Sequence, residues 1–232
     1  MSKNREDELN SLEDLLEYTF KNKFLLNKAL THKSYVNEKN PGLKNNERLE
    51  FLGDSVLDLI VSNYLVANHL DLNEGTLSKI RAAVVNESCL AKLARSLDLG
   101  RYLLLGKGEQ LSGGRDKPSL LANTFEAVAG AIYLDSHFET ACQVLLPAIE
   151  DEIKKYVEKP QFRDFKSELQ EWTQNKFDST PNYQVTQESG PDHEKRFEVA
   201  VLIQNKTFGT GSGRSKKEAE QASAKMALGK IS

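Results

Sequence analysis

The chain has 232 residues, enough for one or two domains with hydrophobic cores of their own. It is 39% hydrophobic and 28% charged, as globular proteins are, and no run of about 18 apolar residues predicts a membrane span. Residues 1–14 are polar and lack the apolar stretch of a secretory signal. Two cysteines are too few for a disulfide framework, so we expect a cytoplasmic protein.

The net charge of −3 does not indicate nucleic-acid binding by itself. Residues 160–232 carry 11 Lys and Arg against 10 Asp and Glu, and the rest of the chain carries 20 against 24. Any nucleic-acid binding must therefore come from local patches.

Helical periodicity dominates the first two thirds of the chain. We expect helices over approximately residues 11–18, 24–30, 47–68, 76–97, 119–134 and 139–157, with a polar loop at 37–45 and a Gly-rich segment at 100–118. This pattern predicts an all-α N-terminal domain over residues 1–153.

The charged segment 154–164 contains Pro160 and interrupts the helical period, so we interpret it as a linker. After it we expect a helix at 165–177, strands at 183–188, 196–203 and 207–211, a tight turn at Asn205-Lys206, and a helix at 215–228. This α-β-β-β-α order predicts a small α+β domain over residues 165–232.

A row of carboxylates marks the helix predicted at 47–68. Glu47, Glu50, Asp54 and Asp58 recur at helical spacing on one face. The neighbouring apolar stripe consists of Leu49, Leu52, Val56, Leu59 and Ile60. Stacked carboxylates repel one another, and no Lys or Arg of this helix lies among them. The row fits a divalent cation such as Mg²⁺, although a solvated acidic face is the alternative.

The helix predicted at 119–134 carries Asn123 and Glu126 on one face. The opposite, buried stripe consists of Leu121, Phe125, Val128 and Ile132. Ala122 and Gly130 flank Glu126 with almost no bulk, and a helical Gly costs about 1 kcal/mol relative to Ala. Close approach of a second helix would explain Gly130. If that helix is the acidic one, Glu126 meets Glu50 and Asp54.

Two further features each allow two interpretations. Phe51 projects away from the apolar stripe of its helix, so it is either buried elsewhere in the same chain or an anchor in a subunit interface. Lys216 and Lys217 begin the last helix beside a Ser215–Glu218 capping box. Because a helix N-terminus is already positive, an anion such as phosphate would stabilise them there; a solvated basic patch is the alternative.

Residues 46–55, Asn-Glu-Arg-Leu-Glu-Phe-Leu-Gly-Asp-Ser, resemble the signature of the ribonuclease III family almost residue for residue. Residues 31–35, 74–78, 106–109 and 113–115 are similar to further motifs of that family, and residues 165–232 resemble a double-stranded-RNA-binding domain. The resemblance covers nearly the whole chain. It implies a Mg²⁺-dependent endoribonuclease, with Mn²⁺ able to substitute, that makes staggered cuts with 5′ phosphates and 3′ hydroxyls in double-stranded RNA.

The resemblance also implies roles for individual residues. The metal-binding positions are Glu50, Asp54, Asn123 and Glu126, of which Asp54 and Glu126 are catalytic. Asn123 departs from the Asp that is usual there. An amide oxygen can coordinate Mg²⁺ but carries no charge, so we expect weaker metal binding. The implied RNA-binding residues are Gln170, Glu171, Gln174, His193, Lys216 and Lys217.

In the family, the position of Phe51 inserts into the partner subunit, which implies a homodimer. The implied substrates are ribosomal RNA precursors and some messenger RNAs. The alternative function is a non-catalytic or weakly active RNA-binding homodimer, favoured by Asn123 alone. His32 could serve in acid–base catalysis, but we expect a structural, hydrogen-bonded histidine because the metal site leaves it no obvious task.

Overall fold

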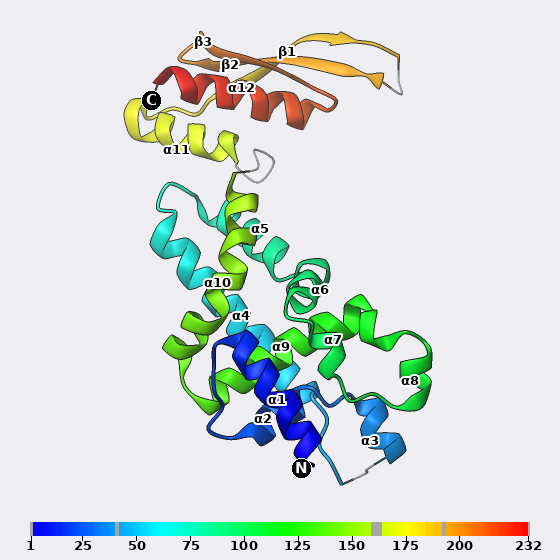
Figure 1. Cartoon of the computed structure of the whole chain (residues 1–232). Coiled ribbons are helices and arrows are strands. Elements are labelled where there is room, and N and C mark those ends of the chain that lie inside the picture. The colour runs from blue at the N-terminus through cyan, green and yellow to red at the C-terminus, as the bar shows by residue number, and fades with distance from the viewer. Residues whose placement is uncertain (1, 40–41, 159–163, 192–193, 232) are drawn as a thin grey trace. The chain divides into compact units, whose positions relative to one another are not determined.

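The computed structural model describes residues 2–39, 42–158, 164–191 and 194–231. The chain divides into two compact units near residue 160. The first is helical, and the second is a three-stranded antiparallel sheet with two helices (Figure 1). The predicted fold class, an all-α domain followed by an α-β-β-β-α domain, is therefore confirmed. In the described part of the chain, no helix has both the length and the apolar character needed to cross a bilayer.

The helical unit is built around two long helices, α4 and α9, which pack against each other. Its elements are α1 (Lys3–Leu16), α2 (Lys23–Ala29), α3 (Lys33–Lys39), α4 (Glu47–Asn68), α5 (Glu74–Val84), α6 (Glu87–Ser96), α7 (Leu99–Tyr102), α8 (Lys107–Leu111), the 3₁₀ turn η1 (Gly114–Asp116), α9 (Pro118–Asp135) and α10 (Phe138–Val157). The stripe predicted on α9 forms part of the core, with Leu121, Phe125, Val128 and Ile132 at most 1% exposed.

The buried face of α4 differs from the predicted stripe. Leu59 is 54% exposed, whereas Leu57 and Val61 are fully buried. Leu57 and Val61 follow Gly53 by four and eight residues, so they lie on the helix face that contacts α9. The contact with α9, which the sequence of α4 alone does not contain, decides which leucines are buried.

The helix predicted at 76–97 is two helices. Asn86 ends the first by capping the second, because its side chain accepts a hydrogen bond from the Cys89 N–H at 2.9 Å. The described structure also contains α3, which the sequence pattern did not predict. None of its residues is fully buried, so it has no apolar period that would have revealed it.

Helix α10 extends into the segment predicted as a linker. Residues 154–157 are helical, and ion pairs link Lys154 to Glu150 and Lys155 to Glu152, both at 2.8 Å. The buried side chain of Ile153 holds this last turn against the unit. Residues 159–163 lie outside the described part.

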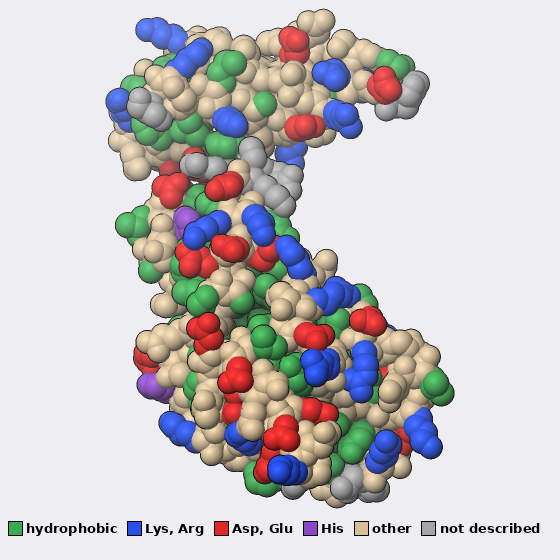
Figure 2. All heavy atoms as spheres, in the orientation of Figure 1, with side chains coloured by type: hydrophobic (Ala, Val, Ile, Leu, Met, Phe, Trp, Pro, Cys, Tyr) green, Lys and Arg blue, Asp and Glu red, His purple; other side chains and the backbone are tan. Residues whose placement is uncertain are grey.

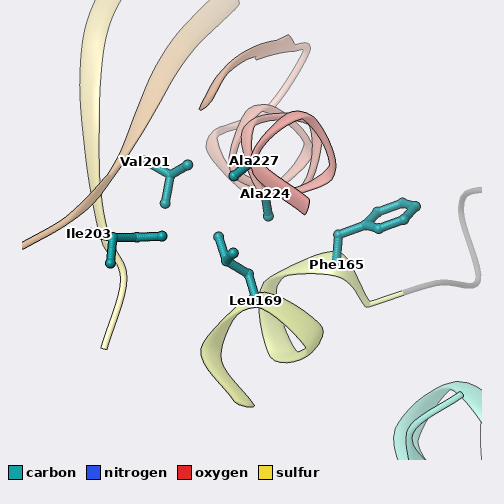
Figure 3. Packing of buried hydrophobic residues seen from close by; sticks show 6 residues of the cluster. All are labelled: Phe165, Leu169, Val201, Ile203, Ala224 and Ala227. Carbon is teal, nitrogen blue, oxygen red and sulfur yellow. The ribbon is translucent and has the colours of Figure 1, made fainter. Parts of the chain in front are cut away.

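The second unit consists of α11 (Phe165–Phe177), β1 (Asn182–Ser189), β2 (Arg196–Ile203), β3 (Lys206–Gly213) and α12 (Lys216–Ile231), with strand order β1-β2-β3. Helix α12 packs on β2 and β3, and α11 packs against α12. Figure 3 shows Leu169 of α11 facing Val201 and Ile203 of β2 and Ala227 of α12, with Phe165 at the margin. This small core holds both helices on one sheet.

The hairpin turn between β2 and β3 lies one residue earlier than predicted. Its central residues are Gln204 and Asn205, with φ of 49° and 62°, and Lys206 already pairs with Ile203. Two consecutive positive φ angles are typical of the turn whose twist matches antiparallel strands.

Candidate active site and nucleic-acid interface

Helices α4 and α9 touch backbone to backbone. A Cβ on Gly53 would lie 1.7 Å from the carbonyl oxygen of Glu126, and a Cβ on Gly130 would lie 2.4 Å from that of Leu49. Any larger side chain at either glycine would separate the helices. The close approach inferred from Gly130 is therefore present, and it places Glu126 beside the segment that carries Glu50 and Asp54.

The structure describes every residue of α9 from 121 to 132. All of them are buried except Asn123 and Glu126, which are partly exposed. These two residues are three apart, so they open on the same face. A helix in the core thus exposes polar groups at one place, and both groups are predicted site residues.

The carboxylates of the two helices interact electrostatically. Burial raises the pKa of Glu126 to about 7, and the neighbouring Asp54 and Glu50 contribute to that rise. Burial and Glu47 raise the pKa of Glu50, while a hydrogen bond with the Asn123 side chain opposes that rise. Glu50, Asp54 and Glu126 therefore interact with one another electrostatically. Asn123 lies beside Glu50 in the same pocket.

The ends of the acidic row are neutralised by cations from other elements. Lys33 Nζ lies 3.3 Å from Glu47 Oε1, and Arg81 Nε lies 3.8 Å from Asp58 Oδ1. Among the residues described, neither Glu50 nor Asp54 has an ion-pair partner of this kind. The uncompensated charge is concentrated at the middle of the row, where Glu126 approaches.

A pocket of about 90 Å³ opens beside this cluster, lined by His32, Lys33, Asn46, Glu47, Glu50, Leu120 and Asn123. Among the described residues, no group of three or more His, Cys, Asp or Glu side chains is arranged so that it could hold a metal ion. Glu50, Asp54, Glu126 and Asn123 carry only oxygen donors of the kind that Mg²⁺ and Mn²⁺ prefer, so these residues would suit such an ion if their side chains turned toward it. Burial, and after it the neighbouring carboxylates, raise the pKa values of Glu126 and Glu50, and a bound cation would stabilise the charged form of both groups.

His32 is held in place by hydrogen bonds. Its Nδ1 lies 2.8 Å from Ser34 Oγ, and Ser34 Oγ accepts the Gly106 N–H at 2.9 Å. The backbone N–H of Ser34 also donates to Nδ1, at 3.3 Å, so Nδ1 acts as an acceptor, the Ser34 hydroxyl donates to it, and the ring proton is left on Nε2. Burial lowers the pKa of His32, which favours this neutral form. These contacts support the structural interpretation of His32.

The predicted RNA-binding residues of α11 lie on an open surface. Gln170, Glu171 and Gln174 are exposed and line a shallow depression with Ser167 and Asn175. Gln174 Nε2 donates to Asp178 Oδ1 at 2.6 Å. His193 lies outside the described residues.

The start of α12 is capped much as predicted. Ser215 Oγ accepts the Glu218 N–H at 3.2 Å, but the Glu218 carboxylate accepts the N–H of Arg214, at 2.8 Å, rather than that of Ser215. Lys216 forms an ion pair with Glu188, whereas Lys217 has none within the described part of the chain. Figure 2 shows basic and acidic side chains interspersed on the drawn face of this unit.

Comparison with known proteins matches both units to described families. Residues 22–153 match the model of ribonuclease-III-like domains, and residues 165–231 match the double-stranded RNA binding motif. The chain belongs to the ribonuclease III family. The relative named Ribonuclease 3 from a Nitratiruptor species is 51% identical over 221 residues, covering 95% of this chain and 96% of its own.

Two other relatives support the same family assignment. The Ribonuclease 3 of a Sulfurovum species is 50% identical over 96% of this chain and 97% of its own. The solved nuclease domain of ribonuclease III from Campylobacter jejuni is 49% identical, with a TM-score of 0.58, covering 62% of this chain and 97% of that one. The resemblance to ribonuclease III is confirmed, as is the prediction of a double-strand-specific endoribonuclease of this type.

In this ribonuclease III chain, Phe51 is 79% exposed, so burial within its own unit is wrong. The packing of α4 and α9 places Glu126 close enough to Glu50 and Asp54 to interact with them electrostatically, and Asn123 lines the same pocket as Glu50. The cations that pair with the ends of the acidic row, Lys33 and Arg81, were not predicted from the sequence. Their distance along the chain left no local signal.

Proposed function

We propose that the chain is a Mg²⁺-dependent endoribonuclease that cleaves both strands of double-stranded RNA, leaving staggered ends with 5′ phosphates and 3′ hydroxyls. The observation that carries this proposal is the contact between Gly53 and Glu126, which holds Glu126 in the field of Asp54 and Glu50. A binding protein without catalysis has no need to bury like charges together.

The proposed ligands of the cation are Glu50, Asp54, Asn123 and Glu126, and Mn²⁺ is expected to replace Mg²⁺. A bound divalent ion would offset both the carboxylate charge and the charge of the scissile phosphodiester. Asp54 and Glu126 are the proposed catalytic residues, because their oxygens can accept hydrogen bonds from the attacking water and so orient it. Asn123 offers an amide oxygen beside Glu50, with which it lines the same pocket.

The proposed active form is a homodimer in which each subunit cuts one strand. The exposed ring of Phe51 on α4 is the proposed anchor of the interface. The description of the Campylobacter jejuni nuclease domain refers to a region involved in dimer formation, which supports this assembly by analogy. We further propose a cytoplasmic location, consistent with two free cysteines, and ribosomal RNA precursors and some messenger RNAs as substrates.

The second unit is proposed to hold the duplex by shape, through 2′-hydroxyls in the minor grooves and phosphates between them. Gln170, Glu171 and Gln174 supply polar groups on the exposed side of α11. His193 is a further proposed contact. Lys216 and Lys217 would meet phosphates at the start of α12.

The test uses a long RNA duplex incubated with the whole protein in Mg²⁺ or in EDTA. We expect cleavage in Mg²⁺ alone. Glu126→Gln should lose at least about 100-fold in cleavage rate, because the negative charge of a metal ligand is removed, and should keep its duplex affinity in EDTA. Tight binding by the unaltered protein without cleavage would support the alternative, a non-catalytic RNA-binding homodimer.

Asn123→Asp tests the role of the amide. A fourth carboxylate should lower the Mg²⁺ concentration needed for half-maximal cleavage several-fold. Asn10→Asp is the matched control, because it adds the same charge at an exposed position of α1 and should leave the Mg²⁺ requirement unchanged. An unchanged requirement in Asn123→Asp would remove Asn123 from the site.

A further inference from the structure

One row of paired residues crosses the sheet of the second unit near the start of α12. Glu188 of β1 pairs with Phe197 of β2, and Phe197 pairs with Gly213 of β3. Directly paired residues point to the same face of a sheet. A Cβ on Gly213 would lie 2.6 Å from the Ala219 nitrogen, so the first turn of α12 covers this end of the row.

This arrangement brings two ammonium groups to one carboxylate. Lys216 Nζ lies 3.1 Å from Glu188 Oε1, and Lys195 Nζ lies 3.4 Å from Glu188 Oε2. Both ammonium groups also lie over the Phe197 ring, at 5.5 Å for Lys216 and 6.0 Å for Lys195. The Glu188 side chain remains 39% exposed, so the cluster is open to a ligand from solvent.

We infer that Glu188 sets the affinity of the second unit for double-stranded RNA by competing with a phosphate for Lys216 and Lys195. The inference rests on the proposed binding of phosphates at the start of α12. A phosphate that reaches Lys216 must displace the carboxylate or share the lysine with it, and the remaining carboxylate repels the phosphate. Lys217, without an ion pair in the described structure, faces no such competition.

This competition predicts whether removing the charge of Glu188 strengthens or weakens binding to the RNA duplex. Glu188→Gln keeps the size of the side chain and removes its charge, so duplex binding should tighten about two- to fivefold, the range of an exposed ion pair. The dependence of the binding constant on salt should also steepen, because one more lysine neutralises phosphate in the complex. If Glu188 instead positions Lys216 for the RNA, binding weakens, and the inference is overturned.

The experiment measures binding of the whole protein in EDTA to a labelled duplex of about 16 base pairs, the span of one such domain. Glu198→Gln is the matched control, because Glu198 is exposed on β2, points to the opposite face, and has no ion pair in the described ranges. We expect a smaller gain from this control. Lys216→Gln should reduce the gain produced by Glu188→Gln.

The outcomes separate this inference from the proposed function. An equal gain from Glu188→Gln and Glu198→Gln would mean that only net charge matters and would overturn the inference. Unchanged binding in Glu188→Gln would overturn it as well, while leaving RNA binding intact. Failure of the unaltered protein to bind the duplex would instead overturn the proposed function.

Discussion

Gly53 of α4 lies against the backbone of Glu126 of α9, where a Cβ would come within 1.7 Å of the Glu126 carbonyl oxygen. The residue after Gly53 is Asp54, so this contact sets the separation between a carboxylate of α4 and one of α9. The same contact buries Glu126 enough to raise its pKa. Packing and electrostatics of the site therefore both depend on Gly53, together with Gly130 on the facing helix.

Gly53→Ala should destabilise the helical unit by about 1–3 kcal/mol, the usual cost of overpacking, and should lower cleavage more than duplex binding. Denaturant midpoints and cleavage rates measure the two effects. Gly75→Ala is the control, because the nearest atom to its Cβ would be 3.7 Å away. Equal stability of the two variants would show that α4 and α9 tolerate a wider separation.

Glu126 should make stability depend on pH when no divalent ion is bound. Its pKa is about 7 in the folded protein against an ordinary value of 4.5, so the folded state binds the proton more tightly. The protonated group favours folding below about pH 4.5, and this contribution is lost as pH rises to about 7. Stability should therefore fall across that range.

Glu126→Gln removes this dependence, because the amide stays neutral. In EDTA at pH 8 the variant should exceed the unaltered protein in free energy of unfolding by about 1–2 kcal/mol, after allowance for solvent screening. The difference should vanish near pH 4.5. Glu139→Gln, at a side chain 73% exposed, is the control for the loss of one surface carboxylate. A constant difference at every pH would contradict the burial of charge at Glu126.

Phe51→Ala should weaken the proposed homodimer at least about tenfold, because large aromatic anchors dominate interface energies. Analytical ultracentrifugation across a concentration series measures the change. Leu111→Ala removes another large apolar side chain, 89% exposed, and should leave the dimer unaltered. If Phe51→Ala dimerises like the unaltered protein, the interface lies elsewhere.

Lys217→Gln should weaken duplex binding more than Lys216→Gln. Lys216 is partly neutralised by Glu188 at 3.1 Å, whereas Lys217 has no ion pair in the described structure. Loss of one phosphate contact should lower the salt slope of log K by about one for Lys217→Gln and by less for Lys216→Gln. Binding isotherms at several salt concentrations test this order; a larger loss for Lys216→Gln would reverse it.

The sequence by itself determined the elements that follow a local period. The predicted ranges 47–68, 165–177 and 196–203 coincide with α4, α11 and β2. Helical spacing alone also grouped Glu50 with Asp54, and Asn123 with Glu126, because residues three or four apart share a helix face.

Only the tertiary structure decided how those faces meet. It buried Leu57 and Val61 while leaving Leu59 exposed, and it brought Arg81 to Asp58. It likewise placed Glu188 between two lysines, one of which follows it by 28 positions in the chain. Contacts between elements depend on backbone separation and on the atoms that other segments contribute. The hydrophobic period of a single helix or strand predicts neither the backbone separation nor the atoms that other segments contribute.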